Sequence, residues 1–297
     1  MTCPFLKEAQ VKSCRTSPVR KLIPLAQTGR ADEKCASAAY VSCPEYRARG
    51  VPEDSGPVCP YLTESLMQYC GAAAVAKFVP YSESLLSRCG NDSFRYCELY
   101  LAIAHPELPA EEIDRMRMPA RLQYSANHMW LDTGDGGMCH AGIDAFLSRV
   151  LGRVDRVGYV SGKGRQRPAA VLTASGVDLE VVFPNSMELE NCNLHLRADP
   201  SRITSEPYTR GWLFEGRTDA ETTRGLRQGA EAHAWMEQEV RRMTEFLQQR
   251  ESTVADGGAF IPGVIHQLKR ERRPGLIREF FSFYRSRQKD ECTCAAG

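Results

Sequence analysis

The sequence predicts an α+β fold in which a β-rich central domain lies between a cysteine-rich, mainly helical tandem repeat and a helical C-terminal tail. A four-cysteine unit occurs twice near the N-terminus, alternating apolar residues and turn-forming pairs mark the middle, and an amphipathic helical pattern follows. The predicted boundaries are 1–50 and 57–104 for the two repeats, 105–122 for a connector, 123–216 for the β domain and 217–297 for the tail.

The charge and hydropathy of the 297-residue chain exclude several classes of partner. Lys and Arg total 38 against 37 for Asp and Glu, so the formal net charge of +1 gives no general attraction for nucleic acid or an anionic membrane. The first ten residues lack the apolar run of a signal peptide, and no later segment is apolar enough to span a membrane. We therefore expect a cytoplasmic protein whose partners are other proteins.

Two copies of one cysteine unit precede the β domain. The first copy contains Cys3, Cys14, Cys35 and Cys43, and the second contains Cys59, Cys70, Cys89 and Cys97 in the same order. Each copy begins with a Cys-Pro-aromatic-Leu segment, and the turn-rich segment 50–57 separates the two. Within the second copy the composition favours helices at 65–76 and 81–87.

The number of cysteines suggests a metal centre in each repeat. Four thiols match the ligand number of a tetrahedral zinc site or a four-iron cluster, and a reducing cytoplasm disfavours structural disulfides. The expected cofactors are zinc or iron–sulfur clusters, with one centre per repeat held by its four cysteines. No Cys-x-x-Cys pair occurs, so the chain must fold back to bring the thiols together. Buried thiols, or two disulfides per unit in an oxidising host, are the alternatives.

The central domain combines hairpin signals with one short helix. The segment 132–137 is dense in turn formers, and 143–152 places apolar residues at helical spacing before a terminal glycine. Apolar and polar residues alternate over 177–183, directly after Ser175 and Gly176. Because glycine supplies the positive φ of a tight turn, this pair predicts the tip of a hairpin.

An ordered series of residues spans this domain. Its members are Tyr124 to Trp130, Gly142-Ile143 with Gly152, Phe183-Pro184, Asn193, Pro200, Ile203, Pro207-Tyr208 and Gly211-Trp212-Leu213. The series resembles the glycine cleavage system H protein family. The resemblance implies a barrel-sandwich hybrid β fold with a lipoyl group on a lysine at an exposed hairpin tip. It also implies the family's function, which is to carry an aminomethyl group among the enzymes that break down glycine.

The position of the carrier lysine holds a different residue. Counting back from Pro184 by the family's interval reaches Gly176, and Thr173 stands where the family has an acidic residue. No lysine occurs between Lys163 and Lys269, and Lys163 belongs to an earlier loop. The lipoyl amide requires a primary amine, so the resemblance implies a degenerate domain without lipoate.

The tail contains two amphipathic patterns and a pair of thiols. Residues 219–250 place apolar side chains on one helical stripe, which would dock on the central domain or form a homodimer. A second helix is expected at 276–284, and the basic run 269–273 before it is interpreted as a solvated linker. Cys292 and Cys294 are candidates for redox or metal-transfer chemistry.

Three hypotheses for the function follow from these features. The sequence shows no set of nucleophile, base and orienting group, so we assign no catalytic residue and expect a protein that is not an enzyme. The first hypothesis is an H protein-like scaffold with a metal- or cluster-binding cysteine module, which acts in protein interaction, redox response or regulation. The second is an iron–sulfur electron-transfer protein that docks a redox partner. The third, an aminomethyl carrier, conflicts with the missing lysine.

Overall fold

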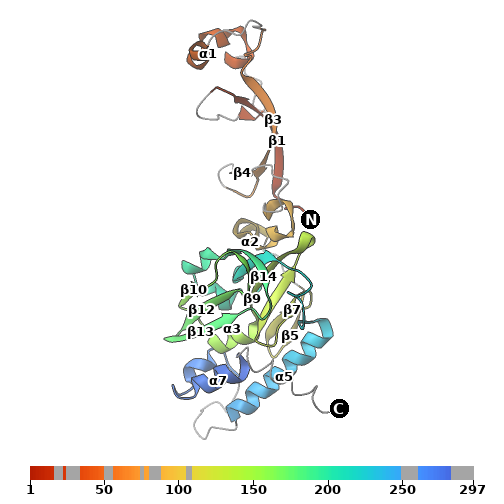
Figure 1. Ribbon diagram of the computed structural model, residues 1–297, viewed down its shortest axis with the longest axis vertical. Helices are drawn as coiled ribbons and strands as arrows, with labels where there is room; N and C mark the ends of the chain where they lie inside the picture. Colours follow the sequence, from red (N-terminus) through yellow and green to blue (C-terminus); the bar gives the residue numbers. More distant parts are fainter. Residues whose placement is uncertain are drawn as a thin grey trace. The chain divides into compact units, whose positions relative to one another are not determined.

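The computed structural model describes residues 1–16, 23–24, 34–49, 56–73, 77–79, 88–104, 109–248 and 260–281. The chain forms two compact units, which are an N-terminal unit, Thr2–Gly90, and a C-terminal unit, Asn91–Gly297 with Met1 (Figure 1). The predicted helix at 81–87 and the pair Cys292 and Cys294 lie outside the described residues. No helix of the described ranges is long and apolar enough to cross a membrane.

The N-terminal unit is built on two long antiparallel strands, one from each cysteine repeat. These are β1 (Leu6–Cys14) and β3 (Leu62–Cys70), flanked by β2 (Ile23–Pro24) and β4 (Lys77–Val79) in the order β2-β1-β3-β4. Short helices follow the strands, namely η2 (Lys34–Ala36), η3 (Ala38–Ser42), α1 (Pro44–Arg49) and η4 (Arg88–Gly90). Each repeat therefore contributes one long strand and a set of short helical turns.

The prediction of mainly helical repeats is wrong for this unit. Residues 65–70, which were expected in a helix, belong to strand β3, and α1 is the longest of its described helices at six residues. Every residue of β3 pairs with a residue of β1, and the paired residues lie 48 to 64 positions apart in the chain. Pairing between distant segments overrides the weak local helix propensity on which the prediction was based.

The C-terminal unit contains a three-stranded sheet, a seven-stranded sheet and a two-stranded hairpin. Their orders are β10-β12-β13, β11-β14-β15-β9-β8-β7-β16 and β5-β6. The strands are β5 (Ala110–Ile113), β6 (Met116–Pro119), β7 (Gln123–Tyr124), β8 (Met129–Thr133), β9 (Met138–Ile143), β10 (Arg156–Tyr159), β11 (Gly164–Gln166), β12 (Ala169–Ala174), β13 (Val177–Val182), β14 (Met187–Cys192), β15 (Phe214–Arg217) and β16 (Arg227–Gln228). The predicted α+β class is confirmed.

Helices surround these sheets. They are η5 (Asp92–Tyr96), α2 (Glu98–Ala104), η6 (Asp135–Gly137), α3 (Ala145–Leu151), η7 (Leu194–Arg197), α4 (Arg202–Ser205), α5 (Gly229–Gln248), α6 (Val264–Gln267) and α7 (Arg273–Phe280). The last part of the second predicted repeat, 91–104, belongs to this unit because Tyr96 packs against its core. The Tyr96 ring stacks 3.9 Å from the His140 ring, and its hydroxyl donates to Asp132 Oδ2 at 2.5 Å.

The local elements predicted for the central domain are confirmed. Strands β8 and β9 pair across the turn-rich segment, and α3 follows β9. Asp144 caps α3 by accepting a hydrogen bond from the Leu147 N–H at 2.9 Å, and Gly152 ends the helix with φ 69°. At the predicted hairpin tip between β12 and β13, Ser175 and Gly176 have φ 46° and 74°, the two left-handed residues of a tight turn.

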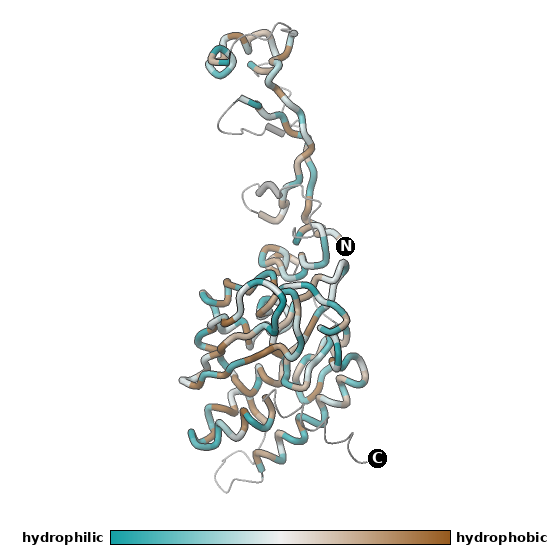
Figure 2. Tube along the Cα trace, in the orientation of Figure 1, coloured by the Kyte–Doolittle hydropathy of each residue, from teal (hydrophilic) through white to brown (hydrophobic). Residues whose placement is uncertain are grey.

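One apolar core joins the sheets to the tail. Helix α5 begins at Gly229, ten residues after the predicted start, because the Asp219 side chain accepts hydrogen bonds from the Glu221 and Thr222 N–H groups and forms a turn there. Hydrophobic and hydrophilic residues alternate along α5 (Figure 2), and its apolar stripe, including Trp235, is buried in the core shared with the central domain. The stripe therefore docks within the chain, and the homodimer stays a prediction.

Candidate functional site

The eight cysteines predicted as metal ligands occupy separate parts of the structure. Cys14, Cys35, Cys43 and Cys59 gather at one end of the β1–β3 ladder. Cys3, Cys70 and Cys89 lie at the other end, and Cys97 precedes α2 in the C-terminal unit. The four cysteines of one repeat are therefore not brought together.

The cysteine side chains of the described residues do not form a ready-made metal site. No group of three or more Cys, His, Asp or Glu side chains there is placed to hold a metal ion, and no disulfide joins the ten cysteines described. Burial raises the pKa of Cys139, in the C-terminal unit, to about 12, and burial likewise raises the pKa of Cys192. These two thiols are protonated near neutral pH and behave as core side chains.

The hairpin tip is where the resemblance places the carrier lysine, and Gly176 occupies it. A Cβ added to Gly176 would meet no atom within 4 Å, so the surrounding chain leaves room for a side chain. Thr173, at the expected acidic position, donates a hydrogen bond from its hydroxyl to Asp178 Oδ1 at 2.6 Å across the hairpin. The Ser175 N–H donates to Asp155 Oδ2 at 2.9 Å. The hairpin thus keeps a defined turn without an amine.

The C-terminal segment lies against this tip. The Ser175 hydroxyl is 3.5 Å from Nε2 of His266, which belongs to α6. A shallow hollow of about 530 Å³ is lined on one side by residues 175–178 and on the other by Arg270, Arg273 and neighbours in α7. The basic run 269–273, interpreted from sequence as a solvated linker, therefore contributes two guanidinium groups next to the lipoyl position.

A close backbone contact attaches the C-terminal segment to α3. The Gly263 N–H donates to the Arg149 carbonyl at 2.7 Å. A Cβ on Gly152 would lie 2.7 Å from Gly263 Cα, which is closer than real Cβ contacts allow. Gly152 also has φ 69°, a left-handed conformation that favours glycine. Only a glycine at position 152 permits α3 and the C-terminal segment to approach this closely.

A buried histidine forms the second attachment. His128 Nδ1 lies 2.9 Å from Asp144 Oδ2, and Nε2 lies 3.7 Å from Glu239 Oε2 on α5. The imidazole stacks on Phe146 at 4.1 Å between ring centroids and meets the Phe281 ring edge-on at 5.5 Å. Burial lowers the pKa of His128, but the charges of Asp144 and Glu239 and the hydrogen bond to Asp144 outweigh burial and raise it to about 9. The imidazolium therefore bridges the central domain and the tail.

These contacts hold the C-terminal segment against the hairpin tip. Among the described residues they do not form a nucleophile–histidine–acceptor set at the tip. A nucleophilic serine needs a histidine whose second nitrogen is oriented by an acceptor. His266 Nδ1 is buried without a hydrogen-bond partner in the described ranges, so nothing orients this ring toward Ser175. We therefore interpret the Ser175–His266 contact as structural.

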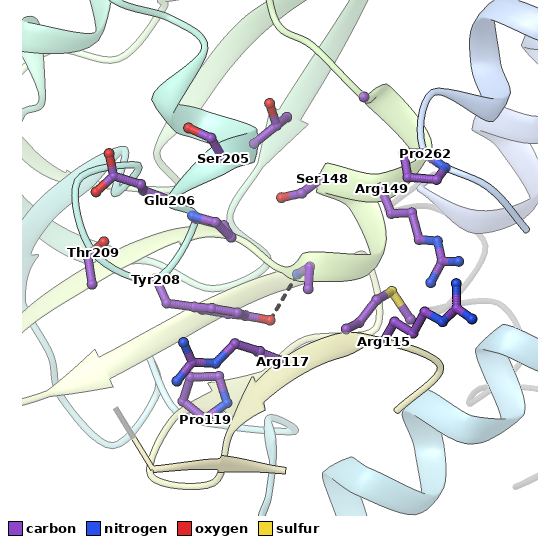
Figure 3. A pocket seen from close by; sticks show the side chains of 15 residues that line it. Arg115, Arg117, Pro119, Ser148, Arg149, Ser205, Glu206, Tyr208, Thr209 and Pro262 are labelled. Carbon is purple, nitrogen blue, oxygen red and sulfur yellow. Dashed lines mark hydrogen bonds between the residues drawn. The ribbon is translucent and has the colours of Figure 1, made fainter. Parts of the chain in front are cut away.

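A second surface feature is a groove of about 630 Å³ beside α3 (Figure 3). Arg115, Arg117 and Arg149 line it together with several hydroxyl groups, and Glu206 is its one acidic lining residue. The Tyr208 hydroxyl points into the groove and accepts a hydrogen bond from the Ala145 N–H at 2.8 Å. Guanidinium groups bind carboxylates and phosphates bidentately, so the groove has the chemistry to bind an anionic group.

Comparison with known proteins assigns the central domain. No protein-family model matches the chain. The chain is 34% identical over 104 residues to the glycine cleavage system H protein of Sodalis glossinidius, an alignment that covers 33% of this chain and 77% of that protein. The chain belongs to the glycine cleavage system H protein family. The resemblance noted in the sequence is thereby confirmed.

Other H proteins give similar alignments. The H protein of Pectobacterium carotovorum is 30% identical over 110 residues, with 35% of this chain and 83% of that protein covered. A crystal structure of the Mycobacterium marinum H protein aligns with 22% identity and a TM-score of 0.35, covering 40% of this chain and 98% of that chain. The sequence alignments cover about a third of the chain, so about two thirds of it lie outside the matched region.

Sequence reasoning missed three residues that contact the site. His266, Gly263 and Glu239 all belong to the tail, and His266 lies 91 positions from Ser175. The amphipathic pattern indicated only that the tail has a buried face. No local signal identifies which partner that face meets, because the contact joins segments far apart in the chain.

Proposed function

We propose that this protein is a non-catalytic H protein-like scaffold, fused to a metal- or cluster-binding cysteine module, that acts in protein interaction, redox response or regulation. The observation that supports it is Gly176 at the hairpin tip, with the chain's own C-terminal segment beside it. A lipoyl carrier needs both a primary amine at this point and a tip that a modifying enzyme can reach. The tip of this domain has no amine, and His266, Arg270 and Arg273 flank it.

The arginine-lined groove supports a role in protein interaction. Arg115 and Arg117 are exposed, and Arg149 pairs with Asp114 at 3.2 Å at the edge of the groove. A partner with an acidic segment would place its carboxylates against these guanidinium groups, and such binding would weaken as salt is added. The glycine cleavage function named for the relatives supports a partner that recognises an H protein surface.

Intact mass spectrometry tests the absence of lipoate. The protein is co-expressed with a lipoate ligase and lipoate, beside an authentic H protein as a positive control. The expected mass of the wild type is that of the unmodified chain. A mass increase of one lipoyl group on the wild type would refute the proposal, and Lys163→Arg would then show whether Lys163 carries it.

Two matched variants show whether the missing amine is the reason that the protein carries no lipoate. Gly176→Lys supplies an amine at an open position, and Gly176→Met supplies a side chain of similar length without one. Each costs about 1 kcal/mol because the turn favours glycine at positive φ. If removal of residues 260–297 is needed before Gly176→Lys accepts lipoate, the C-terminal segment also blocks the tip. Unimpeded lipoylation of full-length Gly176→Lys would show that the segment does not block it.

The alternative is an iron–sulfur electron-transfer protein that docks a redox partner. It is favoured by the gathering of several thiols at each end of the β1–β3 ladder. Purification without oxygen, followed by metal and acid-labile sulfide analysis, separates the alternatives. Iron with sulfide supports electron transfer, and zinc supports a structural module. If the purified protein holds no metal, the cysteine module has neither an electron-transfer nor a structural metal-binding role.

A further inference from the structure

The first cysteine of each repeat forms a backbone hydrogen bond with the other repeat. The Cys59 N–H, from the second copy, donates to the Cys35 carbonyl in the first copy at 2.9 Å. The Cys3 N–H, from the first copy, donates to the Cys89 carbonyl in the second copy, also at 2.9 Å. The same contact therefore occurs twice with the copies swapped. Two independent copies would instead place each first cysteine against its own repeat.

The register of the ladder explains this exchange. Strands β1 and β3 are antiparallel, so Cys14, the last residue of β1, pairs with Leu62, the first residue of β3. Cys59 lies just before β3, and its carbonyl accepts a hydrogen bond from the Leu62 N–H at 3.0 Å. Cys14 and Cys59 therefore lie on neighbouring segments at the same end of the β1–β3 ladder. In Figure 1, α1 lies beyond this end.

The remaining cysteines of the first copy reach the same end. Cys35 and Cys43 pack against a small core formed by Tyr40, Tyr46 and Cys59. The Cys43 N–H donates to the Tyr40 carbonyl at 2.9 Å, which fixes the turn between η3 and α1. Three cysteines from the first copy and one from the second thus lie at the same end of the ladder.

The distance along β1 excludes the grouping of all four cysteines of one copy. The nine-residue strand extends for about 27 Å at roughly 3.4 Å per residue, with Cys3 before its start and Cys14 at its end. Thiolates on one tetrahedral metal lie about 4 Å apart. The first copy therefore cannot place Cys3 and Cys14 on one metal ion.

We propose that Cys14, Cys35, Cys43 and Cys59 form one tetrathiolate metal centre built from both repeats. The inference rests on the metal-binding role proposed above for the cysteine module and identifies the ligands of one centre. The side chains have not converged in the structure, but rotation about χ1 moves a cysteine sulfur by about 3 Å. On binding, each thiol loses its proton to solvent as its sulfur–metal bond forms.

The N-terminal unit has a small apolar core, so a metal centre would stabilise its fold. The buried apolar residues among the described part of the N-terminal unit are few, namely Cys3, Val11, Tyr40, Tyr46 and Cys59. Small units with little buried surface need metals or disulfides to hold their fold. A centre that takes ligands from both copies would fasten the two repeats to each other at the end of the ladder.

Cys3 and Cys59 provide a matched pair of variants to test this. Both are the first cysteine of their copy, and they are buried to the same degree, with 8% and 7% of their surface exposed. The full-length Cys3→Ser and Cys59→Ser proteins are loaded with Zn²⁺, analysed for metal content and treated with an alkylating reagent. Peptide mass spectrometry then measures the modification of Cys14, Cys35 and Cys43.

The expected result is that Cys59→Ser loses about one metal ion per chain and exposes these three thiols to alkylation, whereas Cys3→Ser leaves them protected. Cys59→His, which restores a ligand, should recover the metal and show that the loss is not misfolding. If Cys3→Ser exposes the three thiols and Cys59→Ser does not, each repeat binds its own metal, which overturns this inference and keeps the proposed function. Absence of metal and of protection in the wild type would refute both.

Discussion

Raising the pH is expected to weaken the C-terminal unit through His128. This side chain is fully buried between Asp144 and Glu239, and Arg242 in turn pairs with Glu239 at 2.7 Å. Burial lowers the pKa of His128, but the carboxylates outweigh it and raise the pKa from 6.5 to about 9. Because the folded pKa lies above the unfolded one, the stabilisation is complete below pH 6.5 and is lost as the pH rises through 9.

The size of the effect follows from the same two pKa values. At 1.36 kcal/mol per pH unit, the interval from 6.5 to about 9 corresponds to about 3 kcal/mol of unfolding free energy. About 2 kcal/mol of this remains at pH 7.5, and almost none remains half a unit above the folded pKa. A loss of this size is a large fraction of the stability of an ordinary domain.

Urea unfolding at about pH 6, 7.5 and 9.5 measures this loss, with His128→Asn as the control. Asparagine suits the position because residue 128 has φ 62°, a conformation that asparagine tolerates. The variant is less stable at every pH, but cysteine titration affects it and the wild type alike. The wild type should lose about 3 kcal/mol more than the variant across this range. Equal pH dependence in the two proteins would refute the assignment of a buried imidazolium.

Three further predictions concern the C-terminal unit. Gly152→Ala should detach the C-terminal segment and lower the free energy of unfolding by at least about 2 kcal/mol, because its Cβ would meet Gly263. Limited proteolysis near residue 260 should then be faster than in Gly158→Ala, a control whose Cβ has open space. Cys139 should resist alkylation at about pH 8.5 until urea is added, because burial raises its pKa to about 12. Gly216→Ala should break the β14–β15 pairing at a cost of about 3 kcal/mol or more, measured by thermal unfolding, since its Cβ would overlap the Glu188 carbonyl.

Elements that neighbouring residues determine were predictable from the sequence, and elements that depend on distant contacts were not. The α3 cap at Asp144, its terminal Gly152 and the turn at Ser175 and Gly176 were all predictable, because neighbouring residues determine each of them. Strand β3 was not, since its residues satisfy their backbone hydrogen bonds with β1 rather than within a helix. The start of α5 was misplaced because a side-chain turn at Asp219 competes with the helix.

The sequence by itself determined the family of the central domain, the position of its hairpin tip and the absence of an amine there, because all three depend on residue identity and local order. Only the tertiary structure decided which cysteines meet and what lies beside the tip. Cys59 joins Cys35 through an antiparallel strand register, and Ser175 meets His266 across 91 positions of chain. Such contacts are selected by the burial and hydrogen bonding of the whole fold, which local periodicity does not encode.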